Sequence, residues 1–322
     1  MLDCSRSIVV GLLVAGGLVV AGSGCEAFKP RGTKGKEPGG PIEPKTREQL
    51  VNYLNNQGEK LNGVRFPSVA LTIDAGKEHH TLPNGNLICS KPRNFSLVAG
   101  KVVWSELVQI GSNSSEFWMY SRFPEPTYLY CSHADYQRGS VQTPFPFDPD
   151  WALQALGMSY YDPNQPYRVE LDQPNREQQL IFDTQTPQGK TIRRVVVFAA
   201  DNMGDAKPQV RKHLILDDAG KPIASATISE VTTVAVPGSG NFVQLPTRVT
   251  LDWPQQQFTM EMRMKNPRVN EPISESDQQQ LFTKPTIPGA TPKNLAAMRF
   301  HSGVFRAAPP ARFEGERGTS IP

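Results

Sequence analysis

Serines and histidines are the residues of this chain whose types could support nucleophilic or metal chemistry. The segment 111–115 (GSNSS) resembles the turn that exposes a nucleophilic serine, but that turn needs glycine where Ser114 or Ser115 stands, and a strand-to-helix setting. The histidines are His79, His80, His133, His213 and His301. Their spacing matches no zinc-binding or catalytic motif, and no glycine-rich loop followed by Lys-Ser or Lys-Thr is present for phosphates. The sequence therefore predicts no enzyme, no metal site and no cofactor.

The N-terminal segment offers chemistry of another kind, at a cysteine. Arg6 precedes an apolar and glycine stretch from Ile8 to Ala21, and three small residues come directly before Cys25. This pattern is typical of a lipoprotein signal peptide, here residues 1–24, although the third position before the cysteine is usually leucine and here is Gly22. We expect lipid attachment at Cys25 and a location outside the cytoplasm, on the outer or inner membrane of the cell envelope. Cleavage to a soluble secreted protein is one alternative, and an uncleaved membrane anchor is another.

Two further thiols, Cys89 and Cys131, belong to the body of the protein, because Cys4 lies in the signal segment. Cysteines in an oxidising extracytoplasmic space often pair. A bridge closing a loop of about forty residues would stabilise the fold by roughly 3 to 4 kcal/mol in the chain-entropy model. The sequence predicts a Cys89–Cys131 disulfide, with two buried free thiols as the alternative.

Charge argues against nucleic acid as a partner. The formal net charge is +3, and residues 26–47 alone carry six bases and three acids, so the folded body is nearly neutral. Phosphate binding needs a clustered basic surface, which this body lacks in its sequence. A basic tether could add attraction to an anionic membrane surface, or it could simply be a solvated linker. The oligomeric state is left open.

The chain divides into a tether, one large domain and a tail. Glycine, proline and charge dominate residues 25–45, which predicts a flexible tether. A capping box at 46–49 and apolar residues at helical spacing predict an N-terminal helix that ends near Gly58. A second helix is expected from Asp148-Pro149 to Gly157 in mid-chain. We place the domain at residues 46–284 and a Pro/Arg-rich, partly disordered tail at 285–322.

Most of the domain alternates between apolar and polar residues with period two. The clearest case is the segment 257–265, where Phe258, Met260, Met262 and Met264 share one face and charged or polar residues the other. Such strands have one face exposed to solvent, so the sequence predicts an antiparallel sheet with one covered face. The two helices are expected to cover that apolar face. If they cover it incompletely, the remainder would form an apolar cavity suited to an acyl chain.

Several of these segments together resemble the lipoprotein-carrier-like family, which comprises a periplasmic carrier of lipoproteins and its outer-membrane receptor. The resemblance covers about residues 46–282 and rests on the order and spacing of segments 86–87, 91–95, 109–113, 116–120, 245–248, 270–273 and 281–282. It implies a mainly β fold, an incomplete antiparallel β-barrel (half-barrel) with helices lying in its mouth. It also implies that an acyl chain of a lipoprotein binds inside. The family's lid-latching arginine cannot be assigned to one residue of this sequence, and Arg93 is a candidate by its expected position in a strand.

The leading hypothesis is a membrane-anchored extracytoplasmic protein that binds an acyl chain of a lipoprotein or a similar apolar ligand. The candidate cavity residues are Phe95, Leu97, Trp104, Trp118, Met260 and Met262. The alternative for each of them is ordinary core packing. The alternative function is an envelope-assembly or signalling scaffold that uses the same sheet to bind a protein, and a fully packed interior would favour it.

Overall fold

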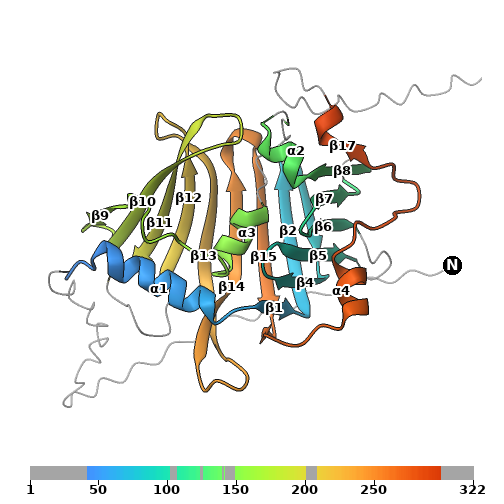
Figure 1. Cartoon of the computed structure of the whole chain (residues 1–322). Helices are drawn as coiled ribbons and strands as arrows, with labels where there is room; N and C mark the ends of the chain where they lie inside the picture. Colours follow the sequence, from blue (N-terminus) through green and yellow to red (C-terminus); the bar gives the residue numbers. More distant parts are fainter. Residues whose placement is uncertain are drawn as a thin grey trace, which may run out of the picture. The chain divides into compact units, whose positions relative to one another are not determined.

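Two antiparallel sheets form the body of the protein. The computed structural model describes residues 42–101, 107–123, 126–139, 141, 149–200 and 209–298. The small sheet has the strand order β16-β1-β4-β5-β6-β7-β8-β17, and the large sheet has the order β3-β2-β15-β14-β13-β12-β11-β10-β9. All neighbouring strands are antiparallel except the short pair β8 and β17. Neither sheet closes on itself, so the predicted mainly β fold with an incomplete barrel is confirmed (Figure 1).

The elements have the following bounds. The small sheet contains β1 (Gly63–Phe66), β4 (Asn84–Ser90), β5 (Asn94–Gly100), β6 (Val108–Ser112), β7 (Glu116–Ser121), β8 (Thr127–Ser132), β16 (Arg268–Val269) and β17 (Lys293–Asn294). The large sheet contains β2 (Ser68–Ala75), β3 (Glu78–Leu82), β9 (Arg168–Asp172), β10 (Glu177–Gln185), β11 (Thr191–Ala199), β12 (Val210–Leu216), β13 (Pro222–Ala235), β14 (Phe242–Trp253) and β15 (Phe258–Lys265). The helices are α1 (Arg47–Glu59), α2 (His133–Gln137), α3 (Pro149–Ala155) and α4 (Glu275–Leu281).

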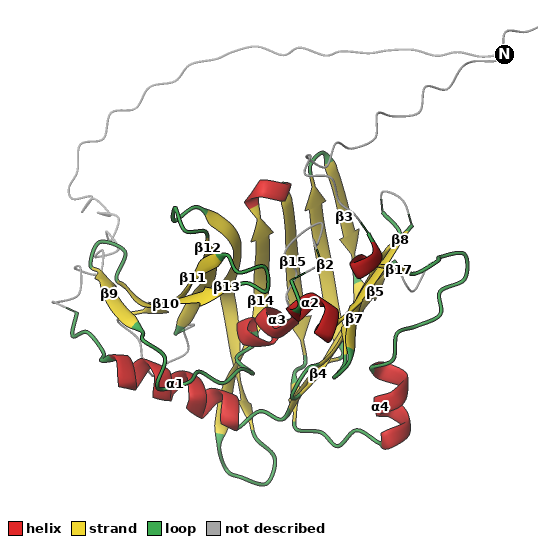
Figure 2. Cartoon of the chain, turned by 45° about the horizontal axis from the view of Figure 1, so that its top comes forward, coloured by secondary structure: helices red, strands yellow, loops and turns green. Residues whose placement is uncertain are grey.

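The main core lies between the two sheets. Alternate residues of the small sheet, such as Leu87 and Leu97, join alternate residues of the large sheet, such as Leu71, Leu251 and Met262, in one buried cluster. The apolar residues at every second position therefore lie on the covered face, as the period-two alternation predicts. Helix α3 contributes to the same cluster, and it lies in the concave space between the sheets (Figure 2).

Helix α1 covers the far end of the large sheet. The predicted capping box is present, because the Thr46 side chain accepts a hydrogen bond from the Gln49 backbone and the Gln49 side chain accepts one from the Thr46 backbone. Leu50, Val51 and Leu54 pack on a cluster that includes residues of β10 and β11. The helix continues through Gly58 and is capped at Lys60, two residues beyond the predicted end at Gly58.

The Pro/Arg-rich tail is predicted to begin at residue 285, but its first part is held on the small sheet. The Tyr128 hydroxyl donates a hydrogen bond to the Pro285 carbonyl at 2.5 Å, and Leu295 is buried beside Leu129 and Cys131 of β8. Residues 299–322 lie outside the described part of the chain, as do Cys25 and the whole of the predicted signal segment and residues 25–41 of the tether. No helix among the described residues is long and apolar enough to cross a membrane.

Gly58 has a packing reason to be glycine inside a helix. A Cβ at this position would lie 2.8 Å from the Ser159 carbonyl oxygen, closer than carbon and oxygen can approach. Gly58→Ala should therefore lower the free energy of unfolding by about 1 kcal/mol, because the overpacking cost exceeds the gain in helix propensity. Urea denaturation measures the change. The exposed neighbour Asn56→Ala is the matched control and should leave stability equal or slightly higher; a stabilised Gly58→Ala would contradict the close packing of α1 on this segment.

Candidate functional site

The space between the sheets, where the sequence places the ligand, is filled in this structure. Phe95 and Leu97 of β5 face Met260 and Met262 of β15, as predicted, and all four side chains are at most 5% exposed. The remaining cavity that they line has a volume of about 10 Å³. A single water molecule needs about that much room, so no acyl chain fits while α3 stays in place. These residues are therefore brought together as predicted, but in a packed core.

Helix α3 is what fills the interior. Trp151 is 1% exposed and contacts Trp253 of β14 edge to face, with ring centroids 5.9 Å apart. Ala152, Ala155 and Leu156 line the residual cavity next to Met260 and Met262. The predicted mid-chain helix is thus present, and Gly157 follows it with a φ of +77°, the left-handed conformation expected of a glycine that ends a helix.

Polar contacts with the turn after β4 and with β11 also hold α3. The Arg93 guanidinium lies 3.0 Å from the Asp150 carboxylate, and Arg194 of β11 donates a hydrogen bond to the Gln154 side chain at 3.3 Å. Arg93 stands in the turn between β4 and β5 at the rim of the small sheet rather than in a strand. Its ion pair is partly exposed, with 31% and 49% of the two side chains accessible. Pairs of this kind typically contribute about 1 kcal/mol or less, which is a small addition to the apolar burial of α3.

Another hollow, larger than the residual interior cavity, lies under α1, near His213 of β12. Its volume is about 50 Å³, and its lining includes Tyr161 and Gln209. Burial, with the nearby Arg194 cation as the second cause, lowers the pKa of His213 to about 4, so this side chain is uncharged at neutral pH. The Tyr161 hydroxyl and the Gln209 side-chain oxygen have no hydrogen-bond partner within the described residues. This hollow suits one or two water molecules rather than a ligand.

Two of the six predicted cavity residues do not belong to this interior. Trp104 lies outside the described residues. Trp118 is buried, but it faces the opposite side of the small sheet and packs with Tyr120 and Tyr128, so its assignment to the interior cavity is wrong. The reason is register, because Trp118 pairs across the sheet with Gly111, whereas the neighbouring Ile110 points inward. Gly111 leaves room for the indole, since a Cβ there would lie 2.3 Å from the ring.

The predicted disulfide is also wrong. Cys89 and Cys131 are both free and fully buried. They lie on β4 and β8, and the register pairs Cys89 with Phe95, Phe95 with Ser112, Ser112 with Phe117, and Phe117 with Cys131. Four strand intervals separate the two thiols by about 19 Å, and a bridge needs Cα atoms within about 7 Å. Burial raises the pKa of both thiols, to about 11 for Cys131, which keeps them protonated and unreactive.

Ser112 and His133 form the one serine–histidine contact that could suggest a nucleophile in the described chain. The Ser112 hydroxyl lies 3.3 Å from His133 Nε2, and the same ring nitrogen lies 2.9 Å from the Asn113 carbonyl oxygen. The serine is fully buried and the histidine is 9% exposed, so no substrate can reach the hydroxyl. No group of three histidine, cysteine or acidic side chains in the described ranges could hold a metal ion. The contact is structural and joins the ends of β6 and β8.

Comparison with known proteins gives structural neighbours only. No family model matches the chain, and no curated protein matches it. A domain named for outer membrane lipoprotein sorting, from Vibrio parahaemolyticus, has a TM-score of 0.48 and 10% identity, covering 72% of this chain and 97% of that one. A DUF1329 family protein from Desulfovibrio piger has a TM-score of 0.44 and 10% identity, covering 71% and 95%. A LolA superfamily protein from Nitrosomonas europaea has a TM-score of 0.43 and 10% identity, covering 75% and 99%.

The names of the first and third neighbours belong to the lipoprotein-sorting and LolA groups. The segments of the sequence resemble the same family. The similarity is too low to transfer a residue role or a ligand to this chain.

Met262 is a direct test of how tightly the interior is packed. Met262→Glu should lower the free energy of unfolding by about 3 kcal/mol or more, because a carboxyl group would be buried without a partner. Denaturant titration measures the loss. Lys265→Glu, an exposed position on the same strand, is the control and should change stability by less than about 0.5 kcal/mol. Equal stability of the two variants would mean that the interior has room for water.

Thiol reactivity checks the position of the cysteines. In the native protein, Cys89 and Cys131 should resist alkylation, because both are buried and protonated. After unfolding without reductant, both should react, and peptide mass mapping would locate the label. Absence of label at both residues under these conditions would mean that they are bridged and that β4 and β8 are not separated by three strands.

Proposed function

We propose that the protein is an extracytoplasmic binding protein that takes up an apolar chain, such as the acyl chain of a lipoprotein, between its two sheets. Helix α3 is the observation that supports the proposal. It is a short element, and its apolar side chains occupy the middle of an otherwise apolar interior. When α3 leaves, Phe95, Leu97, Met260 and Met262 become the wall of a pocket of apolar and adaptable side chains.

In this proposal the described conformation is the closed one, with α3 in the interior. The Arg93–Asp150 ion pair holds α3 at the rim of the small sheet. An apolar ligand competes with Trp151 and its neighbours for the same surface. Only molecules in which α3 has left the interior can bind. The apparent affinity is then the intrinsic affinity multiplied by the fraction of such molecules.

Lipid attachment at Cys25 complements this reading. An anchored binding protein would receive or hold its ligand at the surface of the cell-envelope membrane. The pattern before Cys25 supports the anchor, and it stays a proposal drawn from the sequence. The protein acts by binding, with no covalent step.

The packed interior favours a second candidate, an envelope-assembly or signalling scaffold. A residual cavity of about 10 Å³ is what a permanently closed core would contain. In that case α3 is a fixed part of the core and the protein binds another protein on its surface. The two candidates differ in whether α3 can be displaced by an apolar ligand.

Loosening α3 separates the two candidates. Arg93→Ala removes the ion pair to Asp150 and should raise the affinity for a fluorescent fatty-acyl probe by about two- to fivefold, since a pair of this exposure contributes up to about 1 kcal/mol. Equilibrium fluorescence titration gives the dissociation constants. Arg47→Ala on α1, which breaks an exposed pair with Glu48, is the control and should bind as the wild type does. If the probe binds neither the wild type nor Arg93→Ala, the protein does not bind an apolar chain between its sheets, and the scaffold candidate is favoured.

A further inference from the structure

The outer face of the small sheet carries a second and much larger cavity. Its volume is about 570 Å³, within the range of small-molecule sites. The sheet forms the floor, and a strap formed by residues 270–285, which includes α4, forms the roof. This cavity is on the opposite side of the sheet from the interior, so it is independent of the proposed function.

The strap is fastened firmly at both ends. At its start, the Asn270 side chain accepts hydrogen bonds from the backbone of Asn62 and Gly63 and donates one to the Lys60 carbonyl. At its end, the Asn113 side chain donates to the Phe282 carbonyl at 2.9 Å.

Just after Phe282, the strap also makes a charged contact with the small sheet. Lys284 pairs with Glu116 at 2.9 Å and lies over the Tyr130 ring. Between these ends, α4 has no buried residue, so the strap spans the cavity without filling it.

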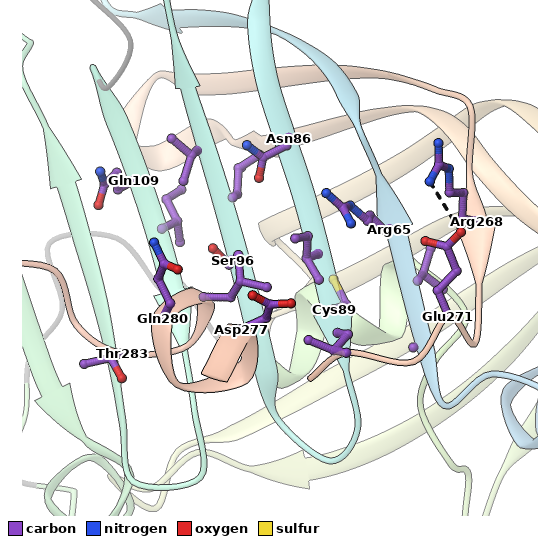
Figure 3. A pocket seen from close by; sticks show the side chains of 18 of the residues that line it. Arg65, Asn86, Cys89, Ser96, Gln109, Arg268, Glu271, Asp277, Gln280 and Thr283 are labelled. Carbon is purple, nitrogen blue, oxygen red and sulfur yellow. Dashed lines mark hydrogen bonds and ion pairs between the residues drawn. The ribbon is translucent and has the colours of Figure 1, made fainter. Parts of the chain in front are cut away.

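The floor contains polar side chains that have no partner. Gln109 is 6% exposed and Ser96 is 8% exposed, yet neither side chain makes a hydrogen bond within the described part of the chain. Figure 3 shows them on neighbouring strands, facing Asp277 and Gln280 of α4 across the cavity. Neither side chain has an atom among the fully buried, unpaired polar atoms of the described residues, so both polar groups reach the cavity and can hydrogen-bond to an occupant there.

Two arginines stand at the β1 end of the cavity. Arg65 and Arg268 are direct cross-strand neighbours on β1 and β16, an arrangement of like charges that destabilises a sheet. Arg268 pairs with Glu271 at 3.4 Å, whereas Arg65 has no acidic partner among the described residues. The free guanidinium suits a carboxylate, which it can bind through two parallel hydrogen bonds.

The geometry points to a binding site for a short peptide with a free C-terminal carboxylate. The carboxylate would bind Arg65, and amide groups of the peptide would bind Ser96 and Gln109. The apolar side chains would lie on Ile88, Val98 and Leu281, which also line the cavity. Arg65 and Gln109 are three strand intervals apart, about 14 Å, and the register offsets them by two residues, about 7 Å, along the strands. Their separation of about 16 Å equals the length of about five extended units, which an acetylated tetrapeptide supplies.

A fatty acid fits this floor less well. Its alkyl chain would cover Ser96 and Gln109 without offering a hydrogen bond, and leaving buried polar groups unpaired opposes binding. A peptide offers a donor or acceptor at each residue. The unpaired polar floor therefore selects the peptide over the fatty acid.

The test uses an N-acetylated tetrapeptide of alternating leucine and alanine, in calorimetric titrations with the full chain. The form with a free carboxylate should bind, and the C-terminal amide should bind about tenfold more weakly, the loss expected for one charge-assisted hydrogen-bond pair. Arg65→Gln should weaken the carboxylate form by a similar factor and abolish the difference between the two forms. Arg47→Gln on α1 is the matched control and should bind as the wild type does.

Gln109→Leu separates binding from folding. Because the Gln109 amide faces the cavity and bonds to no other described residue, the change should leave the thermal midpoint nearly unchanged while it weakens peptide binding several-fold. No binding of the carboxylate peptide at 1 mM would overturn the assignment, and so would equal binding of its amide or wild-type affinity in both variants. Decanoate that binds in the same place, and that Arg65→Gln weakens, would identify the site as one for apolar acids and would also overturn it.

Discussion

The burial of the apolar inner faces of the two sheets against each other is the interaction on which the rest of the structure depends. Each strand turns every second residue inward, and the two inner faces meet around α3 in one cluster that includes Leu71, Leu97 and Met262. Burial of this kind contributes about 25 cal/mol per Å² of apolar surface removed from water. Because this burial is non-directional, it requires that the interior be filled by apolar groups and leaves their exact arrangement to packing. Burial of Trp151 and its apolar neighbours therefore holds α3 in place, and the partly exposed pair of Arg93 with Asp150 adds at most about 1 kcal/mol at its rim.

The small sheet differs from the large sheet in being covered on both faces. Its inner face meets the core, and its outer face lies under the strap and under residues that pack on Tyr120 and Tyr128. This explains why β5 is buried at most positions, where the sequence predicts one wet side. It also explains how one sheet carries two cavities of opposite character, apolar inside and partly polar outside. Side-chain alternation keeps the two separate, since Leu97 belongs to one face and Ser96 to the other.

Local signals predicted the elements well, but not their pairing. The capping box at Thr46, the strand at Met260 to Met264 and the glycine after α3 follow from short-range chemistry and are present. Trp118 and the two cysteines were misplaced because a residue's face, and its distance from another strand, depend on register across several strands, which a single sequence does not encode locally. Helix α4 has a polar sequence without an apolar stripe, yet its Ser274 cap with Asp277 three residues later was a readable signal. The outer cavity could not be predicted, because it depends on residues 208 positions apart meeting at Asn62 and Asn270.

The attachment of the strap at its two ends has a consequence for its motion. A segment that buries nothing in its middle opens with a small free energy, and it does so without unfolding the sheets beneath it. Because both ends stay attached to the sheet, reclosing the strap does not require the loss of chain entropy that bringing two free ends together would cost. Closure is therefore a local event. Amide hydrogens of α4 would therefore exchange with solvent much faster than those of β4 and β5, although all three segments lie within the same cavity wall. The outer face thus combines a floor fixed by sheet hydrogen bonds with a roof that buries little, and the opening of the roof would give the proposed peptide a way in and out while the core stays folded.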